Sequence, residues 1–140
     1  MQVNLHTPSL LRRLGSLLYD AMTFTALWLL AAAVFTAFYG TAVEGWPRHL
    51  LQGICLSVIS IYFLWCWMHG GQTLAMKTWR IRLVDERGAA LALPVALKRY
   101  LFAGAGLGLA GISLWWALLD RDRQFLHDRL AGTRLVQHPG

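Results

Sequence analysis

The chain has 140 residues, of which 56% are hydrophobic and 14% are charged, and its formal net charge is +6. This length corresponds to one domain, residues 1–140. The basic residues lie beside long apolar runs, so we expect them to contact anionic lipid at a membrane face and exclude nucleic acid as the partner.

The first apolar run covers about residues 14–39 and predicts a membrane helix. Thr7-Pro8-Ser9 precedes it and predicts a helix start with Thr7 as the N-cap. Asp20 is the only charged residue between Leu14 and Val43. It interrupts what would be the core of a signal peptide, so we expect the helix to be retained. A carboxylate in such a helix usually faces the bundle interior and has a partner.

The second apolar run covers about residues 50–67, and His69-Gly70-Gly71 ends it. Cys55 and Cys66 lie eleven residues apart in this run, too far along one helix for a disulfide, so we expect ordinary packing. The loop at about 69–99 follows. Its residues 72–79 predict a short interfacial helix, and residues 81–93 predict a small β-hairpin that turns at 85–88.

The third apolar run covers about residues 100–119 and contains four glycines. Gly104 and Gly108 have the GxxxG spacing, a weak indication of helix dimerisation. The run either crosses the membrane or is broken by its glycines into a re-entrant segment. A basic tail, residues 120–140, follows it.

The distribution of basic residues predicts the topology. Arg12 and Arg13 place the amino terminus in the cytoplasm, and the Lys and Arg residues of the 69–99 loop place that loop there too. A third crossing would put the arginines of the tail outside, whereas re-entry keeps them inside. Length favours crossing and charge favours re-entry, and we favour a cytoplasmic tail. The fold class is therefore an all-α integral membrane protein with three hydrophobic helical segments and a small cytoplasmic β-hairpin.

Three separated strings resemble the RDD family of small bacterial integral membrane proteins: RRLGSLLYD, GQTLAMKTWRIRLVDERG and FLHDRLAGTRLV. The family is named for an arginine at the start of the first span, an aspartate within that span and a second aspartate. In this resemblance these three residues match Arg13, Asp20 and Asp128. Gln72 and Thr73 fall in its central G-Q-T-L block, while Ala75 stands where glycine is expected. The resemblance implies a multi-pass protein of the bacterial inner membrane. Transport, including cation/proton antiport, has been suggested for the family, which has no settled general activity.

Arg13, Asp20 and Asp128 are the candidate functional residues. Asp20 with Arg13 forms either a proton or cation relay or a structural ion pair. Seven residues separate them, which is long for direct contact within one helix. Arg13 is instead expected to meet Asp128, and Asp20 to meet Arg99 or a polar group of another span.

The supporting candidates are His127, Gln72 and Thr73. His127 is either part of a site with Asp128 or simply exposed, and Gln72-Thr73 forms either an anion cradle or the cap of a short helix. His69, His127 and Asp128 lack the spacing of a metal site, so we expect no metal and no cofactor. The sequence contains no catalytic arrangement, and we do not expect an enzyme.

We therefore expect a transporter-like protein that exchanges a small cation for a proton at an intramembrane carboxylate. A chain of this size offers little interior for a translocation path, so a homo-oligomer is expected. The alternative is a non-transporting membrane scaffold or accessory subunit that recruits a partner through its basic cytoplasmic face.

Overall fold

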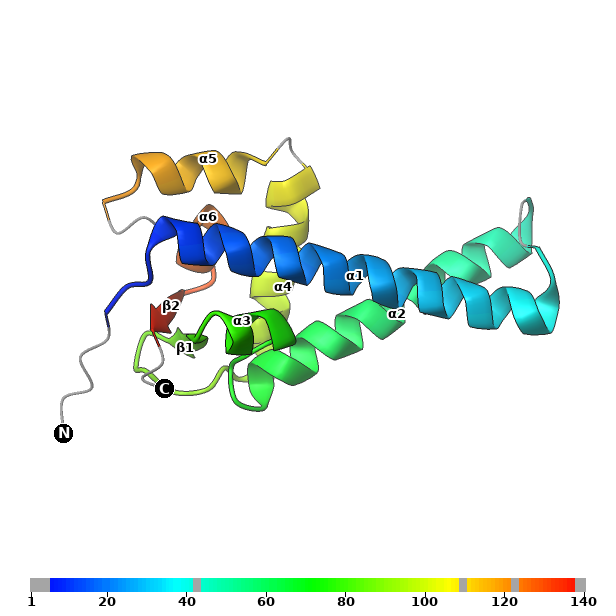
Figure 1. The fold of residues 1–140 in the computed structure, drawn as a ribbon, viewed down its shortest axis with the longest axis horizontal. Helices are drawn as coiled ribbons and strands as arrows, with labels where there is room; N and C mark the ends of the chain where they lie inside the picture. The colour runs from blue at the N-terminus through cyan, green and yellow to red at the C-terminus, as the bar shows by residue number, and fades with distance from the viewer. Residues whose placement is uncertain (1–5, 42–43, 109–110, 122–123, 138–140) are drawn as a thin grey trace.

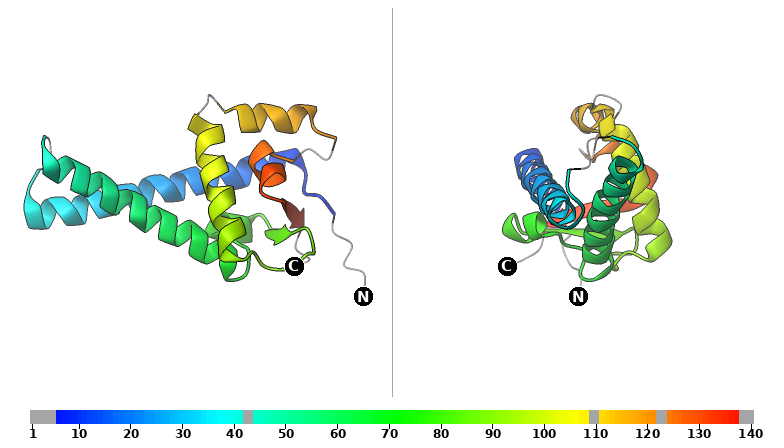
Figure 2. Two further views of the ribbon diagram at one scale, coloured as in Figure 1. Left: turned by 180° about the vertical axis from the view of Figure 1, so that it is seen from behind. Right: turned by 90° about the vertical axis from the view of Figure 1, so that its right-hand side faces the viewer.

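Two long helices form a hairpin that projects from a group of shorter elements (Figure 1). The structure is a computed structural model and describes residues 6–41, 44–108, 111–121 and 124–137. Helix α1 is Leu10–Tyr39 and helix α2 is Trp46–Met68. The shorter elements gather around the open end of this hairpin, as both views in Figure 2 show. The first and last described segments lie there too, because the Gln137 amide donates to the His6 carbonyl at 2.9 Å.

Helix α1 begins later than the sequence predicts. The N-cap is Ser9, whose hydroxyl accepts a hydrogen bond from the Arg12 amide at 3.4 Å, so the prediction of Thr7 was wrong. The Pro8 carbonyl is not part of the helix and accepts a hydrogen bond from Arg13 Nε at 3.1 Å. The entry into α1 is therefore fixed by a side chain from inside the helix as well as by the cap.

The two helices of the hairpin expose apolar side chains, as the helices of a membrane protein do. Both helices are long and apolar enough to cross a membrane, with mean hydropathies of 1.9 and 1.8 over their most apolar stretches. Only 11% and 17% of those stretches are buried, whereas the core helix of a soluble protein would be mostly buried. The buried residues of α1 are Arg13, Ser16, Asp20 and Phe35. Most apolar side chains of the two helices thus face outward, while three of the four buried residues of α1 are polar.

The strand that follows α2 pairs with the carboxy-terminal strand. After α2 come helix α3 (Leu74–Thr78) and strand β1 (Ile81–Asp85), which pairs antiparallel with β2 (Thr133–Gln137) in the register Leu83↔Leu135. The prediction of a local β-hairpin at residues 81–93 was therefore wrong. The Asp85 carboxylate turns the chain by accepting from the amides of Arg87 and Ala89, and no returning strand follows, because helix α4 already begins at Leu93.

The third apolar run does not form one straight helix. Helix α4 (Leu93–Gly108) and helix α5 (Ile112–Leu119) meet at Gly111, which has a left-handed φ of 72°. In Figure 1, α5 turns sharply away from α4. Helix α6 (Leu126–Leu130) then leads into β2. Because β2 pairs with β1, the tail lies at the same end of the hairpin as the 69–99 loop and the start of α1.

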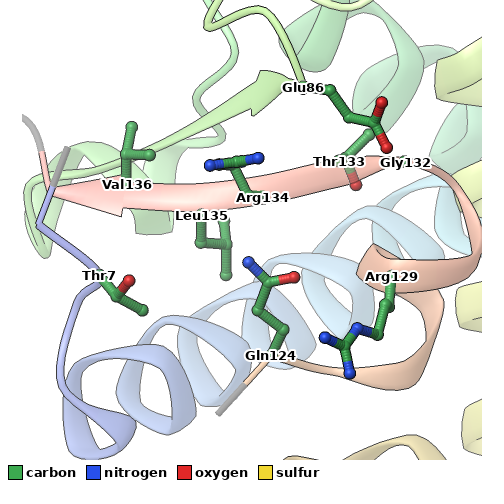
Figure 3. Close-up of a pocket in the computed structure, with 9 residues that line it drawn as sticks. All are labelled: Thr7, Glu86, Gln124, Arg129, Gly132, Thr133, Arg134, Leu135 and Val136. Atoms are coloured by element: carbon green, nitrogen blue, oxygen red, sulfur yellow. The ribbon is translucent and has the colours of Figure 1, made fainter. Parts of the chain in front are cut away.

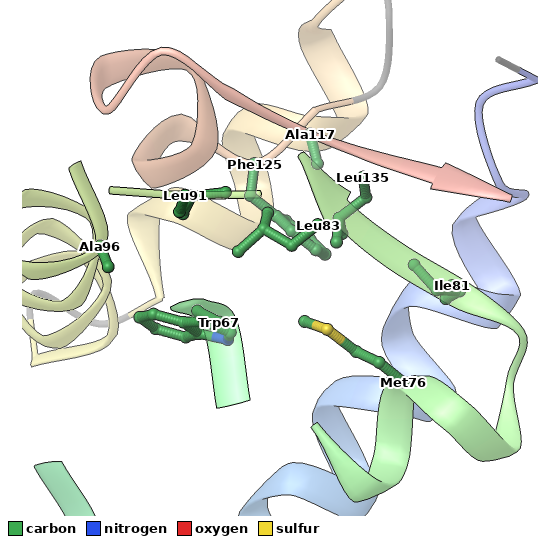
Figure 4. Packing of buried hydrophobic residues seen from close by; sticks show 9 residues of the cluster. All are labelled: Trp67, Met76, Ile81, Leu83, Leu91, Ala96, Ala117, Phe125 and Leu135. Atoms are coloured by element: carbon green, nitrogen blue, oxygen red, sulfur yellow. The ribbon is translucent and has the colours of Figure 1, made fainter. Parts of the chain in front are cut away.

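A single apolar cluster holds the short elements together at the open end of the hairpin. In Figure 4, Leu83 of β1, Leu135 of β2 and Phe125 point toward one another, with Leu91 and Ala117 beside them. All of these side chains are buried. This core fixes α4, α5 and α6 against the sheet, and it thereby positions the polar residues described next.

Candidate functional site

The first half of α1 carries a stripe of buried polar side chains. Arg13, Ser16 and Asp20 are spaced by three and four residues, so they lie on one face of the helix. Their exposed fractions are 1%, 4% and 8%. Ser16 Oγ has no hydrogen-bond partner within the described part of the chain. Ser16 was not among the candidates predicted from the sequence, although its position midway between Arg13 and Asp20 would have indicated it.

Asp20 lies beside groups from two other elements. The side chain of Thr73 interacts with its carboxylate, and the charge of Arg99 acts on it from α4. Its Oδ1 atom accepts no hydrogen bond from the residues described. Asp20 was expected to meet Arg99 or a polar group of another span. Arg99 acts on Asp20 through its charge, and the side chain that interacts with it directly is Thr73, which caps α3 and does not belong to a span.

Thr73 is held in place by the start of α3. It is the N-cap of that helix, where its hydroxyl accepts a hydrogen bond from the Met76 amide at 3.2 Å. Gln72 Nε2 donates to the Ile81 carbonyl at 2.8 Å, which ties the same segment to β1. Gly71 lies so close to β1 that a Cβ atom there would be 2.2 Å from the Leu83 carbonyl oxygen. The segment Gly71-Gln72-Thr73 is thus a capped, anchored helix start that carries a hydroxyl to Asp20.

Arg99 forms a buried ion pair with Asp128. Arg99 Nη2 lies 2.7 Å from Asp128 Oδ1, and Arg99 Nε donates to the same oxygen at 2.9 Å. The guanidinium also lies over the Trp67 ring, 4.4 Å from its centroid, where a cation is attracted by the aromatic face. Arg13 was the expected partner of Asp128, and the structure pairs Asp128 with Arg99 of α4. Pairing α4 with α6 needs the tertiary fold, which spacing along the chain does not reveal.

His127 is buried next to this ion pair. Its exposed fraction is 3%, its ring stacks on Phe125, and its Nε2 atom lies 3.5 Å from Asp128 Oδ1. The pKa of His127 is lowered to about 4, chiefly by burial; the Asp128 carboxylate opposes this shift and the Arg99 charge adds to it. His127 is therefore neutral at physiological pH, and the alternative of an exposed histidine was wrong.

We call Asp20, Thr73, Arg99, His127 and Asp128 the polar cluster. With His127 neutral, it contains two carboxylates and one guanidinium. Arg99 is committed directly to Asp128, so the carboxylate of Asp20 receives its charge only at longer range. When both carboxylates are ionised, their negative charges lie near the guanidinium of Arg99 and on the same side of α1 as the buried guanidinium of Arg13.

Two cavities lie outside the polar cluster. A polar one of about 280 Å³ is lined by the start of the chain, α6 and β2, and Figure 3 shows Glu86, Arg129 and Arg134 around it. An apolar groove of about 340 Å³ lies between α1 and α2, toward their connecting loop. Among the residues that the structure describes, no group of three or more His, Cys, Asp or Glu side chains is arranged to hold a metal ion.

Comparison with known proteins identifies one family. The sequence model of the RDD family matches residues 7–132, which include the stripe on α1 and the whole polar cluster. No curated protein and no solved structure gives a significant match.

Proposed function

The chain is a membrane protein of the RDD family, and we propose that it exchanges protons for a small cation, with the Asp20 carboxylate as the exchanging group. The observation that carries the proposal is that the two buried carboxylates, Asp20 and Asp128, have different interaction partners. Each carboxylate has one oxygen without a hydrogen bond from the described residues, Oδ1 of Asp20 and Oδ2 of Asp128. Asp128 is nevertheless held by a direct ion pair with Arg99, whereas Asp20 interacts with the Thr73 side chain and receives the charge of Arg99 only at longer range.

The exchange is a simple acid–base step. The protonated carboxyl of Asp20 releases its proton as the cation binds, and the cation then balances the negative charge of the carboxylate. Oxygen atoms are suitable ligands for such a cation. The Thr73 hydroxyl, which belongs to the side chain that interacts with Asp20, and the Ser16 hydroxyl, which lies on the same face of α1, are the candidate neutral ligands. Arg99 then has a positioning role, because it fixes Asp128 and biases Asp20 electrostatically.

The proposal includes a cellular location and an oligomeric state. The basic residues at the open end of the hairpin favour the cytoplasmic face of the bacterial inner membrane for that end, where anionic lipid attracts them. A translocation path requires more than one hairpin, which favours a homo-oligomer. Gly104 and Gly108 on α4 support close approach of a second copy, since added Cβ atoms there would meet nothing within 4 Å.

Proton flux driven by a cation gradient tests the proposal. Purified protein in vesicles should move protons when Na⁺, K⁺ or Li⁺ is added, and Asp20→Asn should abolish this flux while the protein still inserts and assembles. Glu44→Gln is the matched control, because Glu44 is exposed in the loop between α1 and α2. Equal flux in Asp20→Asn and Glu44→Gln would reject Asp20 as the exchanging group.

The scaffold function is the second candidate, and the exposed basic residues of the short elements favour it. These include Lys77, Arg80, Arg87 and Lys98. In a scaffold the polar cluster would serve only to hold the fold, so Asp20→Asn would lower the yield of folded protein without any flux to lose. A folded, correctly oriented wild type without flux for any of the three cations would favour this function.

A further inference from the structure

The described side chains of helix α5 expose an apolar surface. Leu119 is 83% exposed and Trp115 is 67% exposed, and Ile112, Trp116 and Leu118 are exposed as well. Among the side chains of α5 that the structure describes, Ala117 turns inward and is fully buried in the apolar core. Continuous apolar surface of this kind marks an interaction site rather than a surface in contact with water.

The helix is too short to cross a membrane. Its eight residues span about 12 Å, against roughly 30 Å for the hydrocarbon core of a bilayer. At its end Asp120 is buried, accepts a hydrogen bond from the Gln124 amide at 3.1 Å, and is paired with Arg129. The chain therefore turns back toward β2 at this point instead of continuing in the direction of α5.

The level of α5 along the hairpin indicates what covers its apolar surface. In Figure 1 and in the left view of Figure 2, the axis of α5 runs roughly along that of α1, at the level of the amino-terminal part of α1. That part of α1 also exposes apolar side chains, with Leu11 at 80% and Leu18 at 63%. A lipid layer that surrounds the start of α1 therefore reaches α5 at the same level.

We propose that α5 docks into the acyl-chain region of one leaflet, the leaflet at the amino-terminal end of α1, and does not cross the membrane. Trp115 and Trp116 suit this depth, because tryptophan prefers the boundary between hydrocarbon and headgroups. Arg121 is exposed directly after the helix and lies where it reaches anionic headgroups. Because α5 packs against α6, the docked helix covers the side of the fold that carries His127 and Asp128.

Site-directed spin labelling of the full chain in vesicles tests the proposal. The native cysteines are first replaced (Cys55→Ala, Cys66→Ala), and a nitroxide is attached at Leu119→Cys. Leu118→Cys provides a second position should the first variant fold poorly. Leu29→Cys, 63% exposed on α1, is the lipid-facing reference, and Arg87→Cys, exposed in the turn after β1, is the water-facing reference.

The label at position 119 should collide with oxygen severalfold more often than the label at position 87, and less often than the label at position 29, which lies deeper in the bilayer. It should be protected severalfold from a water-soluble nickel chelate relative to the label at position 87. Nickel accessibility equal to that at position 87 would place α5 in water and overturn the proposal. Protection from both reagents, with dipolar broadening between labels on different chains, would show that a second copy covers α5 and would overturn it as well.

Discussion

Arg99 connects the two buried carboxylates of the polar cluster in different ways. It pairs directly with Asp128 at 2.7 Å and acts on Asp20 only through its charge. Such a buried pair contributes little net stability relative to apolar packing, but removing one partner leaves the other as an uncompensated charge. The pair is therefore expected to matter most when it is broken.

Arg99→Ala should destabilise the fold by about 3 to 5 kcal/mol, because Asp128 is 1% exposed and would remain buried without its partner. This loss is measured as the difference between the free energies of unfolding of the wild type and of Arg99→Ala in detergent. The matched control is Lys98→Ala, since Lys98 is the exposed neighbour on the same helix and should change stability by less than about 0.5 kcal/mol. A loss in Arg99→Ala no larger than in the control would show that the ion pair is not formed.

His127 should make the fold sensitive to acid. Its pKa falls from 6.5 to about 4 on folding, so the unfolded chain binds a proton at a pH where the folded chain does not. This contribution to stability is complete above pH 7 and is lost as the pH falls from about 6.5 to 4, by up to about 3 kcal/mol.

The measurement for His127 is the free energy of unfolding across this pH range in the wild type and in His127→Gln. The carboxylates titrate in both proteins, so the difference between the two curves isolates the histidine. The difference should grow as the pH falls below 6.5. Parallel curves would mean that His127 is not buried in its neutral form.

At the scale of elements, the Gly71 segment joins the hairpin to the sheet. Gly71 has a φ of +69°, and its carbonyl accepts a hydrogen bond from the Leu83 amide at 2.7 Å. The backbones approach so closely that no side chain fits between them. This contact sets the position of Thr73 two residues later, and hence its place beside Asp20.

Gly71→Ala should cost more than about 3 kcal/mol, because it adds a clash with the Leu83 carbonyl to the strain of a positive φ. Gly88→Ala separates the two effects. Gly88 has a similar φ of +81° but nothing within 4 Å of an added Cβ, so it should lose only about 1 to 2 kcal/mol. The midpoint of thermal unfolding compares the two variants, and equal shifts would contradict the close contact.

The sequence predicted those elements that depend on local pattern. The runs at 14–39 and 50–67 became α1 and α2 because a long apolar run specifies a helix by itself. The strand at Ile81–Asp85 was found, but its partner lies about fifty residues away, and alternation within a strand does not identify the partner. The sequence did not predict the Arg99–Asp128 pair either, because these two residues also lie far apart along the chain. Of the resemblance-based residues, Asp20 and Asp128 both interact with Arg99, and Thr73 interacts with Asp20. Arg13 is buried on the same face of α1 as Asp20 and donates a hydrogen bond to the Pro8 carbonyl.

At the scale of the whole molecule, the pairing of β1 with β2 determines the topology. It places the tail with the 69–99 loop at the open end of the hairpin, so α4 and α5 together must return to the side from which they start. We therefore expect that, of this fold, only the loop between α1 and α2 reaches the other side of the membrane.

Labelling of single cysteines in intact cells tests this arrangement in the Cys55→Ala, Cys66→Ala background. A membrane-impermeant thiol reagent should label Glu44→Cys, in the α1–α2 loop, and should reach Arg134→Cys on β2 only after the membrane is permeabilised. Both positions are exposed in the fold. Labelling of both from outside would mean three crossings, and labelling of position 134 alone would reverse the proposed orientation.

The central claim is that the Asp20 carboxyl exchanges a proton for a cation, and infrared difference spectroscopy observes that proton directly. Adding Na⁺ at constant pH to reconstituted wild-type protein should deplete the C=O band of a protonated carboxyl group and produce the bands of a carboxylate. Asp20→Asn should lack this change, and Glu44→Gln should retain it. A spectrum that does not respond to Na⁺, K⁺ or Li⁺, or a response that persists in Asp20→Asn, would contradict the account.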